Sequence, residues 1–334
     1  MMTATVPEKR IELVHFQITR GCNLHCWFCG QWGKKGFFSN ASGAPMTLDD
    51  WKKATDSLVS YRDASGISPS VIVWGGEPLT SPYFRQISEY LHMRNFKLGL
   101  ITNGVLLDKY ADTIADMYSK IYVSVDGTRD IHDSIRGEGV YDRVMKNLSL
   151  FTSAETEVII MSVLSAELLG CIPEFLDSLE KIKPSQVLLQ DMIHMSQGEI
   201  DSYTEWFKNC FNAVPSEIKS WNIALPENYE NEKQKALAGI DYGKYSFDVI
   251  HKEHASDGGK RHCLSPFRHV HVAWNGNVLF CTDFYDYSAG NVRDGDIADI
   301  FMGNSAEKFR NEILSGNCVT CNHCSWRGND SFYL

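Results

Sequence analysis

The stretch GCNLHCWFCG, residues 21–30, concentrates thiols in one short segment near the start of the chain. The three cysteines are Cys22, Cys26 and Cys29. Thiols separated by two and three residues suit a metal centre, because one tight loop can direct all of them inward. A structural zinc site takes four protein ligands, and His15 or His25 could supply the fourth. A [4Fe–4S] cluster takes one ligand per iron, so three cysteines leave one iron open to another molecule.

The overall composition is that of an acidic globular protein. The 334 residues are 43% hydrophobic and 22% charged, and the net charge is −10. This charge argues against nucleic acid or an anionic membrane surface as the main partner. No apolar run is long enough to span a bilayer, and the charged N-terminus lacks the apolar core of a signal peptide, so we expect a cytoplasmic protein. Ten cysteines in that reducing compartment favour metal binding over disulfides.

Strand-like and helix-like segments alternate through the first two thirds of the chain. Apolar, β-rich runs predict strands at 13–19, 70–74, 97–102, 120–125, 157–164 and 186–190. Amphipathic stretches between them predict helices. This order is typical of βα units around a parallel sheet, arranged either as an open doubly wound sheet or as a partial barrel. The strands are almost continuously apolar, as expected where both faces of a sheet are covered.

Polar or glycine-rich residues stand at the ends of four of these predicted strands. The three-thiol loop follows the first strand, WGGEP (74–78) the second and TNG (102–104) the third, and SVDG (124–127) closes the fourth. Because the carboxyl ends of parallel strands lie at one edge, we expect these segments to form one site. Each signal is weak alone, since Gly-Gly turns are common and both Asn103 and Asp126 could be ordinary turn residues.

The C-x3-C-x2-C spacing, followed one strand later by GGEP, resembles the radical S-adenosylmethionine (SAM) superfamily over about residues 10–200. The resemblance implies an α/β fold, a (β/α)6 partial TIM barrel, in which the three cysteines hold a [4Fe–4S] cluster and SAM chelates the open iron. It implies that Phe28 packs near the adenine and that Glu77 holds the methionine ammonium. The full set of SAM-binding residues that it implies is Phe28, Gly75, Gly76, Glu77, Pro78, Asn103, Ser124, Asp126 and Arg136.

Five further cysteines lie in the last quarter of the chain. They are Cys263, Cys281, Cys318, Cys321 and Cys324. Between the first two, Asn275-Gly276 predicts the turn of a β-hairpin, and two helical stretches precede the closing CVTCNHC. This order resembles the SPASM/Twitch extension of radical SAM enzymes, which holds auxiliary [4Fe–4S] clusters. Full SPASM domains carry seven or more cysteines, so five thiols imply one auxiliary cluster.

The resemblance implies four ligands for this auxiliary cluster. They are Cys263, Cys281, Cys321 and Cys324, because CNHC is similar to the closing CxxC of these domains. Cys318 is then a free thiol, an exchangeable ligand or a hydrogen donor. A zinc ribbon is the alternative. The histidines that keep it open are His262, His269, His271 and His323.

We expect the chain to divide into three segments. Residues 1–221 form a radical SAM partial-barrel domain, residues 222–262 a bridging segment, and residues 263–334 a SPASM/Twitch-like auxiliary cluster domain. The bridging segment is polar, charged and weakly periodic, and it could line the opening through which substrate enters.

The resemblance implies that a 5′-deoxyadenosyl radical abstracts hydrogen from a carbon of the substrate, with an electron donor such as flavodoxin or ferredoxin as partner. Oxidation of the substrate radical needs a base near the auxiliary cluster, and Asp283 is the candidate. Epimerisation needs a thiol that is not a ligand, and Cys318 is the candidate. Cys171 and Cys210 fall within helical patterns and are expected to be buried structural residues.

The position of the first strand bears on the substrate. It starts near residue 13, which leaves no room for the leader-recognition domain usual in peptide-modifying members of the superfamily. We therefore expect a small molecule, such as a sugar, an aminocyclitol or a nucleotide-linked intermediate, and its dehydrogenation. Radical epimerisation and modification of a ribosomally made peptide are the alternatives. A non-enzymatic iron–sulfur or zinc scaffold is a further one, but it leaves GGEP unexplained.

Overall fold

The computed structural model describes residues 7–32, 43–151, 155–254, 263–281 and 285–324. A ten-stranded sheet has the strand order β10-β9-β8-β1-β2-β3-β4-β5-β6-β7. The strands are β1 (Leu13–Gln17), β2 (Ser70–Trp74), β3 (Leu98–Thr102), β4 (Tyr118–Ser124), β5 (Glu157–Leu164), β6 (Gln186–Asp191), β7 (Asp248–Lys252), β8 (His269–Val272), β9 (Asn277–Leu279) and β10 (Gly290–Asn291). Neighbouring strands are parallel throughout the run β8-β1-β2-β3-β4-β5-β6-β7 of the sheet. The pairs β8–β9 and β9–β10 are antiparallel.

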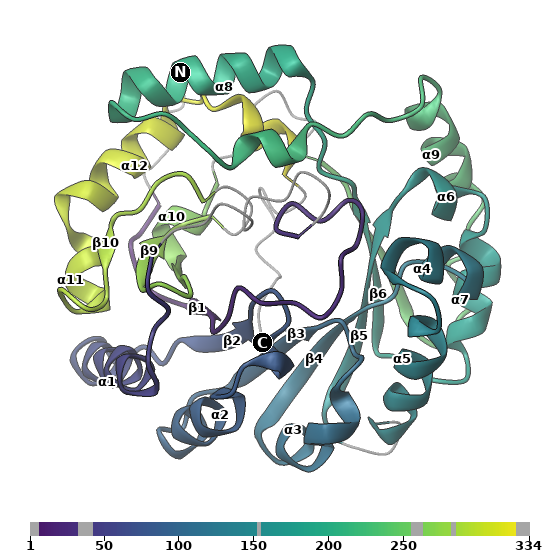
Figure 1. The fold of residues 1–334 in the computed structure, drawn as a ribbon, viewed down its shortest axis with the longest axis horizontal. Coiled ribbons are helices and arrows are strands. Elements are labelled where there is room, and N and C mark those ends of the chain that lie inside the picture. Colours follow the sequence, from purple (N-terminus) through teal and green to yellow (C-terminus); the bar gives the residue numbers. More distant parts are fainter. Residues whose placement is uncertain (1–6, 33–42, 152–154, 255–262, 282–284, 325–334) are drawn as a thin grey trace.

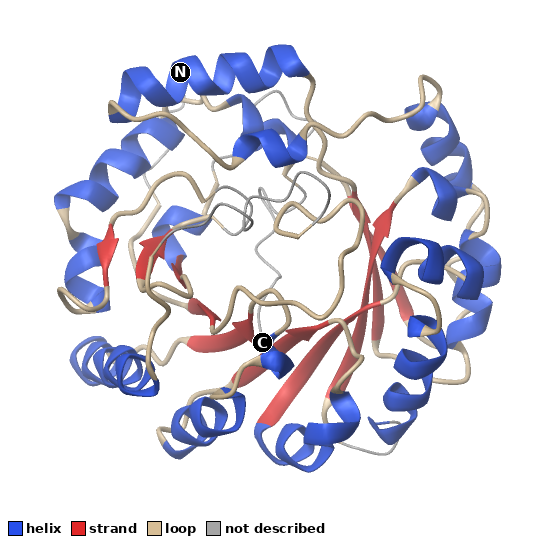
Figure 2. Cartoon of the chain, in the orientation of Figure 1, coloured by secondary structure: helices blue, strands red, loops and turns tan. Residues whose placement is uncertain are grey.

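Helices surround the curved sheet, so that the strands line the inside of a partial barrel (Figures 1 and 2). The α-helices are α1 (Leu48–Ser65), α2 (Phe84–Met93), α3 (Ala111–Met117), α4 (Arg129–Arg136), α5 (Val140–Leu148), α6 (Ala166–Leu169), α7 (Ile172–Leu179), α8 (Gln197–Phe211), α9 (Tyr229–Ala238), α10 (Ser265–Arg268), α11 (Ile297–Met302) and α12 (Asn304–Leu314). Short 3₁₀ turns are η2 (Pro78–Thr80), η3 (Leu107–Tyr110), η4 (Ser149–Phe151), η5 (Ile218–Trp221) and η6 (Val319–His323).

Local sequence sets the ends of the first helix. At its start, Thr47 and Asp50 form a reciprocal capping box: the Asp50 N–H donates to the Thr47 hydroxyl at 3.2 Å, and the Thr47 N–H donates to the Asp50 carboxylate at 2.9 Å. At its end, Gly66 adopts a left-handed φ of +74°, and its N–H donates to the carbonyl of Arg62. Helix α1 therefore begins and ends where its sequence dictates.

Both faces of the central strands are buried, as their apolar sequences predict. On β1, Val14 and Phe16 face outward and join the large core beneath the helices. Leu13 points into the barrel, where it packs in a smaller inner cluster with Ile72 and Tyr122. This alternation leaves the carboxyl ends of the strands as the open edge of the barrel.

The parallel sheet and partial barrel predicted from the sequence are confirmed, and all six predicted strands form. Strand β7 is an addition: it lies within the bridging segment 222–262 and pairs with β6 from Gln186↔Asp248 onward. It was missed because it is a half-covered edge strand with a polar sequence. The predicted hairpin is also confirmed as β8–β9, and β8 extends the barrel sheet beside β1. The division at residues 221 and 262 stays a prediction.

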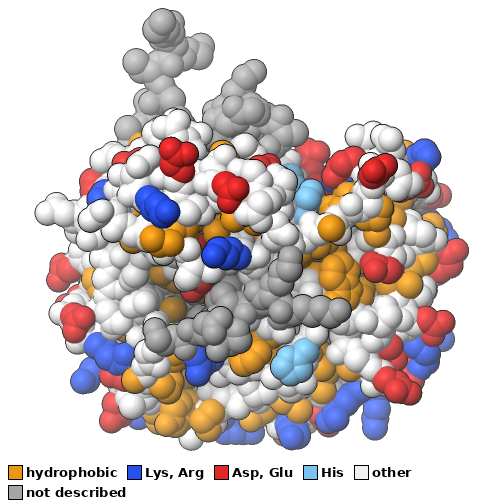
Figure 3. Space-filling view, turned by 45° about the horizontal axis from the view of Figure 1, so that its top comes forward, with side chains coloured by type: hydrophobic (Ala, Val, Ile, Leu, Met, Phe, Trp, Pro, Cys, Tyr) orange, Lys and Arg blue, Asp and Glu red, His pale blue; other side chains and the backbone are white. Residues whose placement is uncertain are grey.

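On the face of the molecule that Figure 3 shows, acidic and basic side chains are interspersed and do not form separate patches of one charge. Within the described ranges, every helix is either too short or too polar to cross a bilayer.

Candidate functional site

The open edge of the barrel contains a cavity of about 300 Å³. The strand-end segments predicted to share one site do so here. The predicted residues that line the cavity are Cys22, Cys26, Phe28, Cys29, Gly75, Gly76, Asn103, Ser124 and Arg136. Glu77, Pro78 and Asp126 are not among the lining residues; they lie behind it.

Backbone N–H groups of the thiol loop donate hydrogen bonds to two of its cysteine sulfurs. The N–H of Leu24 donates to the Cys22 sulfur and the N–H of Trp32 to the Cys29 sulfur, each at 3.4 Å. Burial raises the pKa of Cys22 to about 12, so without a metal this thiol is protonated. A bound metal reverses this preference, because coordinating thiols are deprotonated, and N–H donors to sulfur stabilise the charged form. Three such thiols fit a cluster with one open iron.

The zinc alternative for this loop finds no support in the side chains. His15 lies inside the barrel, where its ring contacts Trp74 and His271. His25 packs edge-on against Trp32. Over the described part of the chain, no three His, Cys, Asp or Glu side chains converge closely enough to ligate a single metal ion.

Gly75 and Gly76 of the GGEP motif pack tightly against the residues that lead into the thiol loop. The N–H of Gly76 donates to the carbonyl of Thr19 at 3.0 Å, and the N–H of Glu77 donates to that of Gly21 at 2.7 Å. A Cβ atom on Gly76 would lie 2.4 Å from the carbonyl oxygen of Gly21, and one on Gly75 would lie 2.5 Å from that of Thr19. Only glycine allows this approach, so the motif fixes the loop against β2.

Glu77 is fully buried and bound by three donors. Its carboxylate accepts from the Thr102 hydroxyl at 2.7 Å and from the N–H groups of Asn103 at 2.7 Å and Leu79 at 3.1 Å. Burial raises the pKa of Glu77 to about 7, although these hydrogen bonds favour the carboxylate. Pro78 is the first residue of η2, which Glu77 caps.

Asn103, from the TNG segment, reaches the thiol loop. Its amide donates to Asn23 at 2.9 Å and lies 3.9 Å from the Cys22 sulfur. Its oxygen accepts from the N–H of Val105, as in an ordinary turn. Asn103 therefore combines the turn role and the site role that the sequence left open.

Asp126 and Arg136 form a buried ion pair at the edge of the cavity. Both Nε and Nη2 of Arg136 lie 2.7 Å from one carboxylate oxygen of Asp126, and the N–H of Val163 donates to the other at 2.8 Å. Burial alone would lower the pKa of Arg136, but Asp126 and the nearby thiols raise it. Asp126 thus holds Arg136 in place, and Arg136 is the member that lines the cavity.

An aromatic wall faces the thiol loop, and the sequence did not reveal it as part of the site. Its members are Trp32, Trp74, Trp221 and Tyr285. The rings of Trp74 and Tyr285 are nearly parallel, at 28° with centroids 6.4 Å apart. Two polar atoms here, Nε1 of Trp74 and Oε1 of Gln31, have no hydrogen-bond partner within the described residues. The alternation along β2 could have placed Trp74 inside the barrel, but no local signal marks Tyr285.

Asp191, at the end of β6, completes the cavity. It accepts hydrogen bonds from Lys233 at 3.0 Å, from the His251 ring at 2.9 Å and from the N–H of His254 at 3.0 Å. Burial opposes its ionisation, yet these partners hold its pKa well below the usual range. Its charge is therefore neutralised within the protein.

A second, small cavity of about 40 Å³ lies between α8, α12 and the β8–β9 region. Its sulfur-bearing lining residues are Cys263, Cys281, Cys318 and Cys321. Aromatic side chains, including Tyr203, Trp206 and Phe280, close it off. Four thiols in an apolar shell fit a fully ligated [4Fe–4S] cluster.

Cys318, predicted to be a free thiol, an exchangeable ligand or a hydrogen donor, lies among the thiols of the second cavity. It is 7% exposed, and a hydrogen bond between its sulfur and that of Cys321 lowers the pKa of Cys318 and raises that of Cys321. Cys324, predicted as a ligand, interacts electrostatically with Cys321 but is not among the lining residues. Cys318 lines the second cavity and not the first. The predicted base Asp283 lies outside the described residues.

The histidines of the zinc-ribbon alternative do not gather around these thiols. His323 bonds the Glu199 carboxylate at 2.7 Å, and the Nδ1 of His269 lies 3.1 Å from the Ser265 hydroxyl. His271 points into the barrel, where its ring lies edge-on to Trp74. His262 lies outside the described residues.

Comparison with known families agrees with both sites. The radical SAM superfamily model matches residues 16–179, and the model of the SPASM iron–sulfur cluster-binding domain matches residues 263–325. The chain therefore belongs to the radical SAM superfamily and carries a C-terminal SPASM domain. This membership implies a [4Fe–4S] cluster with SAM at the first site and an auxiliary iron–sulfur cluster at the second.

Individual relatives are distant. The chain is 24% identical to an AdoMet-dependent heme synthase of Methanosarcina barkeri, over 93% of this chain and 88% of that protein. It is 23% identical to the Fe-coproporphyrin III synthase of the same organism, over 94% and 80%. Streptococcus suis SuiB bound to S-adenosylmethionine has a TM-score of 0.64 at 14% identity, over 88% of this chain and 66% of SuiB. The AdoMet-bound enzyme anSMEcpe has a TM-score of 0.62 at 20% identity, over 90% and 83%. These likenesses to solved structures show the fold alone.

Proposed function

We propose that this radical SAM enzyme abstracts a hydrogen atom from a carbon of a small molecule and completes the reaction as a dehydrogenation. One observation carries the proposal: the chain has two thiol sites. A three-thiol loop lies beside a compact cavity with an aromatic wall, and four further thiols line a separate cavity in the extension. When bound, the first cluster supplies the electron that cleaves SAM to a 5′-deoxyadenosyl radical, and the auxiliary cluster supplies an acceptor for the electron that leaves the substrate.

In this proposal the residues of the first cavity have distinct tasks. Gly75 and Gly76, with Glu77 behind them, hold the methionine end of SAM. Arg136 and Ser124 line the same cavity and would hold the carboxylate or ribose. The tryptophan-rich wall excludes water, which protects a radical from side reactions. An external electron donor such as flavodoxin or ferredoxin supplies the reductant.

For the second site we propose the ligand set Cys263, Cys281, Cys318 and Cys321, because these four sulfurs share one cavity. A thiol that ligates a cluster cannot also give a hydrogen atom to a substrate radical. This assignment favours oxidation over epimerisation. Asp283, two residues beyond Cys281, remains the predicted acceptor of the substrate proton.

The chemistry of the cavity wall supports a neutral, ring-shaped polar substrate such as a sugar or an aminocyclitol. Aromatic faces stack against rings, and the wall presents several of them. The charged side chains among the described lining residues, Asp191 and Arg136, are already paired. This arrangement favours an uncharged ring over a phosphate-bearing nucleotide.

A porphyrin is the second candidate, because relatives similar over almost the whole chain are named for heme and Fe-coproporphyrin III. A peptide is the third, since SuiB binds its precursor peptide SuiA. The aromatic part of the cavity wall, formed by Trp74, Trp221 and Tyr285, favours a small ring-shaped molecule over either.

The test is anaerobic reconstitution with SAM and a reductant in deuterated water, with neutral sugars, aminocyclitols, Fe-coproporphyrin III and peptides offered separately. We expect 5′-deoxyadenosine together with a product two mass units lighter that carries no carbon-bound deuterium. A product that gains one deuterium at carbon without oxidation would instead identify an epimerase. The control is the triple alanine variant of Cys22, Cys26 and Cys29, which should form no 5′-deoxyadenosine.

A further inference from the structure

Trp274, at the tip of the β8–β9 hairpin, joins the two ends of the thiol loop. Its indole is 5% exposed, and the Arg20 guanidinium lies over the ring with its carbon 4.7 Å from the ring centroid. Trp32 packs against it, and the Trp32 indole N–H donates to the carbonyl of Arg20. Arg20 lies two residues before Cys22, and Trp32 lies three residues after Cys29. One side chain of the SPASM extension therefore contacts both flanks of the SAM-binding loop.

The backbone of Trp274 strengthens this contact. Its carbonyl accepts from the N–H of Met46 at 2.8 Å, and its N–H lies 3.4 Å from the side-chain oxygen of Gln17. Gln17 is the fully buried last residue of β1, from which the thiol loop departs. Met46 belongs to the segment that leads into α1. The hairpin tip is thus fixed to the chain on both sides of the loop.

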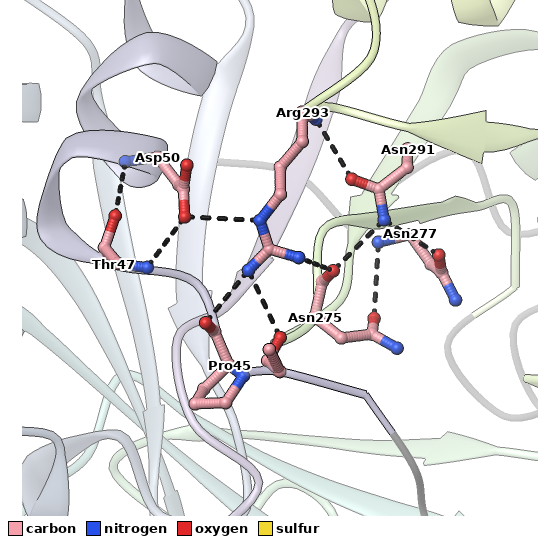
Figure 4. Close-up of polar contacts among 8 residues, drawn as sticks. Pro45, Thr47, Asp50, Asn275, Asn277, Asn291 and Arg293 are labelled. Carbon is pink, nitrogen blue, oxygen red and sulfur yellow. Dashed lines mark hydrogen bonds and ion pairs between the residues drawn. The ribbon is translucent and has the colours of Figure 1, made fainter.

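Arg293 makes a second attachment on the same hairpin turn (Figure 4). Its Nη1 donates to the carbonyl of Asn275 at 2.8 Å, and its Nη2 donates to the carbonyls of Pro45 at 2.9 Å and Ala44 at 3.2 Å. Its Nε lies 3.3 Å from the carboxylate of Asp50, which forms the capping box of α1 with Thr47. The planar guanidinium has enough donors in fixed directions for all four acceptors, whereas the single ammonium of lysine does not.

We propose that Trp274 and Arg293 are positioning residues for SAM: the hairpin of the SPASM extension sets the geometry of the thiol loop and so controls SAM affinity, independently of substrate. Neither residue lines the SAM cavity, so both act through the loop. Displacements of about 1 Å are enough to impair a binding or catalytic geometry. A purely structural role would instead lower the stability of the fold and leave SAM affinity unchanged.

The test compares Arg293→Lys with the matched control Arg62→Lys. Arg62 is a half-buried arginine of α1 that also bonds a backbone carbonyl, that of Arg94, and a carboxylate, but it lies away from the cavity lining. SAM dissociation constants are measured by equilibrium dialysis on the anaerobically reconstituted enzyme. We expect about a fivefold weaker SAM affinity for Arg293→Lys, the change that corresponds to about one lost hydrogen bond, and no change for the control.

A second readout does not depend on the cofactors. In the unloaded chain, amide hydrogen exchange over residues 20–32 should accelerate in Arg293→Lys and, more strongly, in Trp274→Leu. Trp274→Phe, which keeps an aromatic ring beneath Arg20, should restore most of the protection and keep the fold if the leucine variant is unstable. The proposal is overturned if SAM affinity and loop exchange in Arg293→Lys match those of Arg62→Lys, whatever happens to the melting temperature.

Discussion

The protonation state of Glu77 should make SAM binding depend on pH near neutrality. One oxygen of Glu77 accepts from Thr102 and Leu79, and among the described residues the other accepts from the N–H of Asn103 alone. A carboxylate oxygen can accept more than one hydrogen bond, and in the proposed role of Glu77 the amino group of SAM donates to this oxygen. A protonated Glu77 would present a hydrogen where SAM needs an acceptor. In the proposed role of Glu77, SAM binding should therefore require the ionised carboxylate.

The sign and size of the effect follow from the raised pKa. Burial brings the pKa of Glu77 to about 7 in the unliganded protein, so below this pH SAM must displace a proton. About one tenth of Glu77 is ionised at pH 6 and about nine tenths at pH 8, so SAM should bind about tenfold more weakly at pH 6. Above pH 8 Glu77 is almost fully ionised, so its contribution to the SAM affinity should no longer change with pH.

Equilibrium dialysis of SAM between pH 6 and pH 8, on enzyme whose iron content is checked at each pH, measures this dependence. The amino group of SAM titrates near pH 8. The Glu77→Gln variant reports that contribution separately, because its amide does not ionise. We expect the variant to bind SAM more weakly and with a flatter profile. Parallel profiles for the wild type and Glu77→Gln would refute the role assigned to this carboxylate.

Two further substitutions test the buried charges and the auxiliary ligands. Asp126→Asn leaves the charge of Arg136 uncompensated in a buried position, so urea unfolding should show that the free energy of unfolding falls by about 3–5 kcal/mol. The control Asp142→Asn removes one partner of an exposed ion pair and should lower the free energy of unfolding by less than about 1 kcal/mol. Equal losses of stability in the two variants would mean that burial does not govern the Asp126–Arg136 pair. Cys318→Ala should reduce the iron content from about eight to about four per chain while Cys324→Ala keeps about eight; the reverse pattern would return Cys324 to the ligand set.

Features encoded locally could be predicted from the sequence. The strands that precede the thiol loop and GGEP are short apolar runs, and the hairpin follows from Asn275-Gly276, whose Gly276 has a φ of +88°. Features made by distant segments could not be predicted. Tyr285 joins the cavity only because the extension folds back onto the barrel, and β7 becomes a strand only because β6 offers it an edge.

Sequence spacing also does not distinguish Cys318 from Cys324 as the fourth ligand of the auxiliary cluster. Both lie in one cysteine-rich segment with identical two-residue gaps to Cys321, so spacing alone does not separate them. The 3₁₀ turn η6, which starts at Val319, places Cys318 and Cys321 on the cavity side. The resemblance predicts Cys324 as the fourth ligand, whereas the position of the turn favours Cys318, and the ligand set stays a prediction.

The sheet itself connects the two cofactor sites. Strand β8 pairs with β1 from Leu13↔His269 onward, so the extension shares the hydrogen-bonded frame from which the thiol loop departs. The hairpin then runs from Trp274, against that loop, to Cys281 in the second cavity, a separation of seven residues. Seven extended residues span at most about 25 Å. A paired hairpin changes its length little, so the separation of the two sites is fixed by backbone hydrogen bonds rather than by a flexible linker. The two cavities are therefore held in one constant geometry, which the proposed hydrogen abstraction followed by electron removal requires.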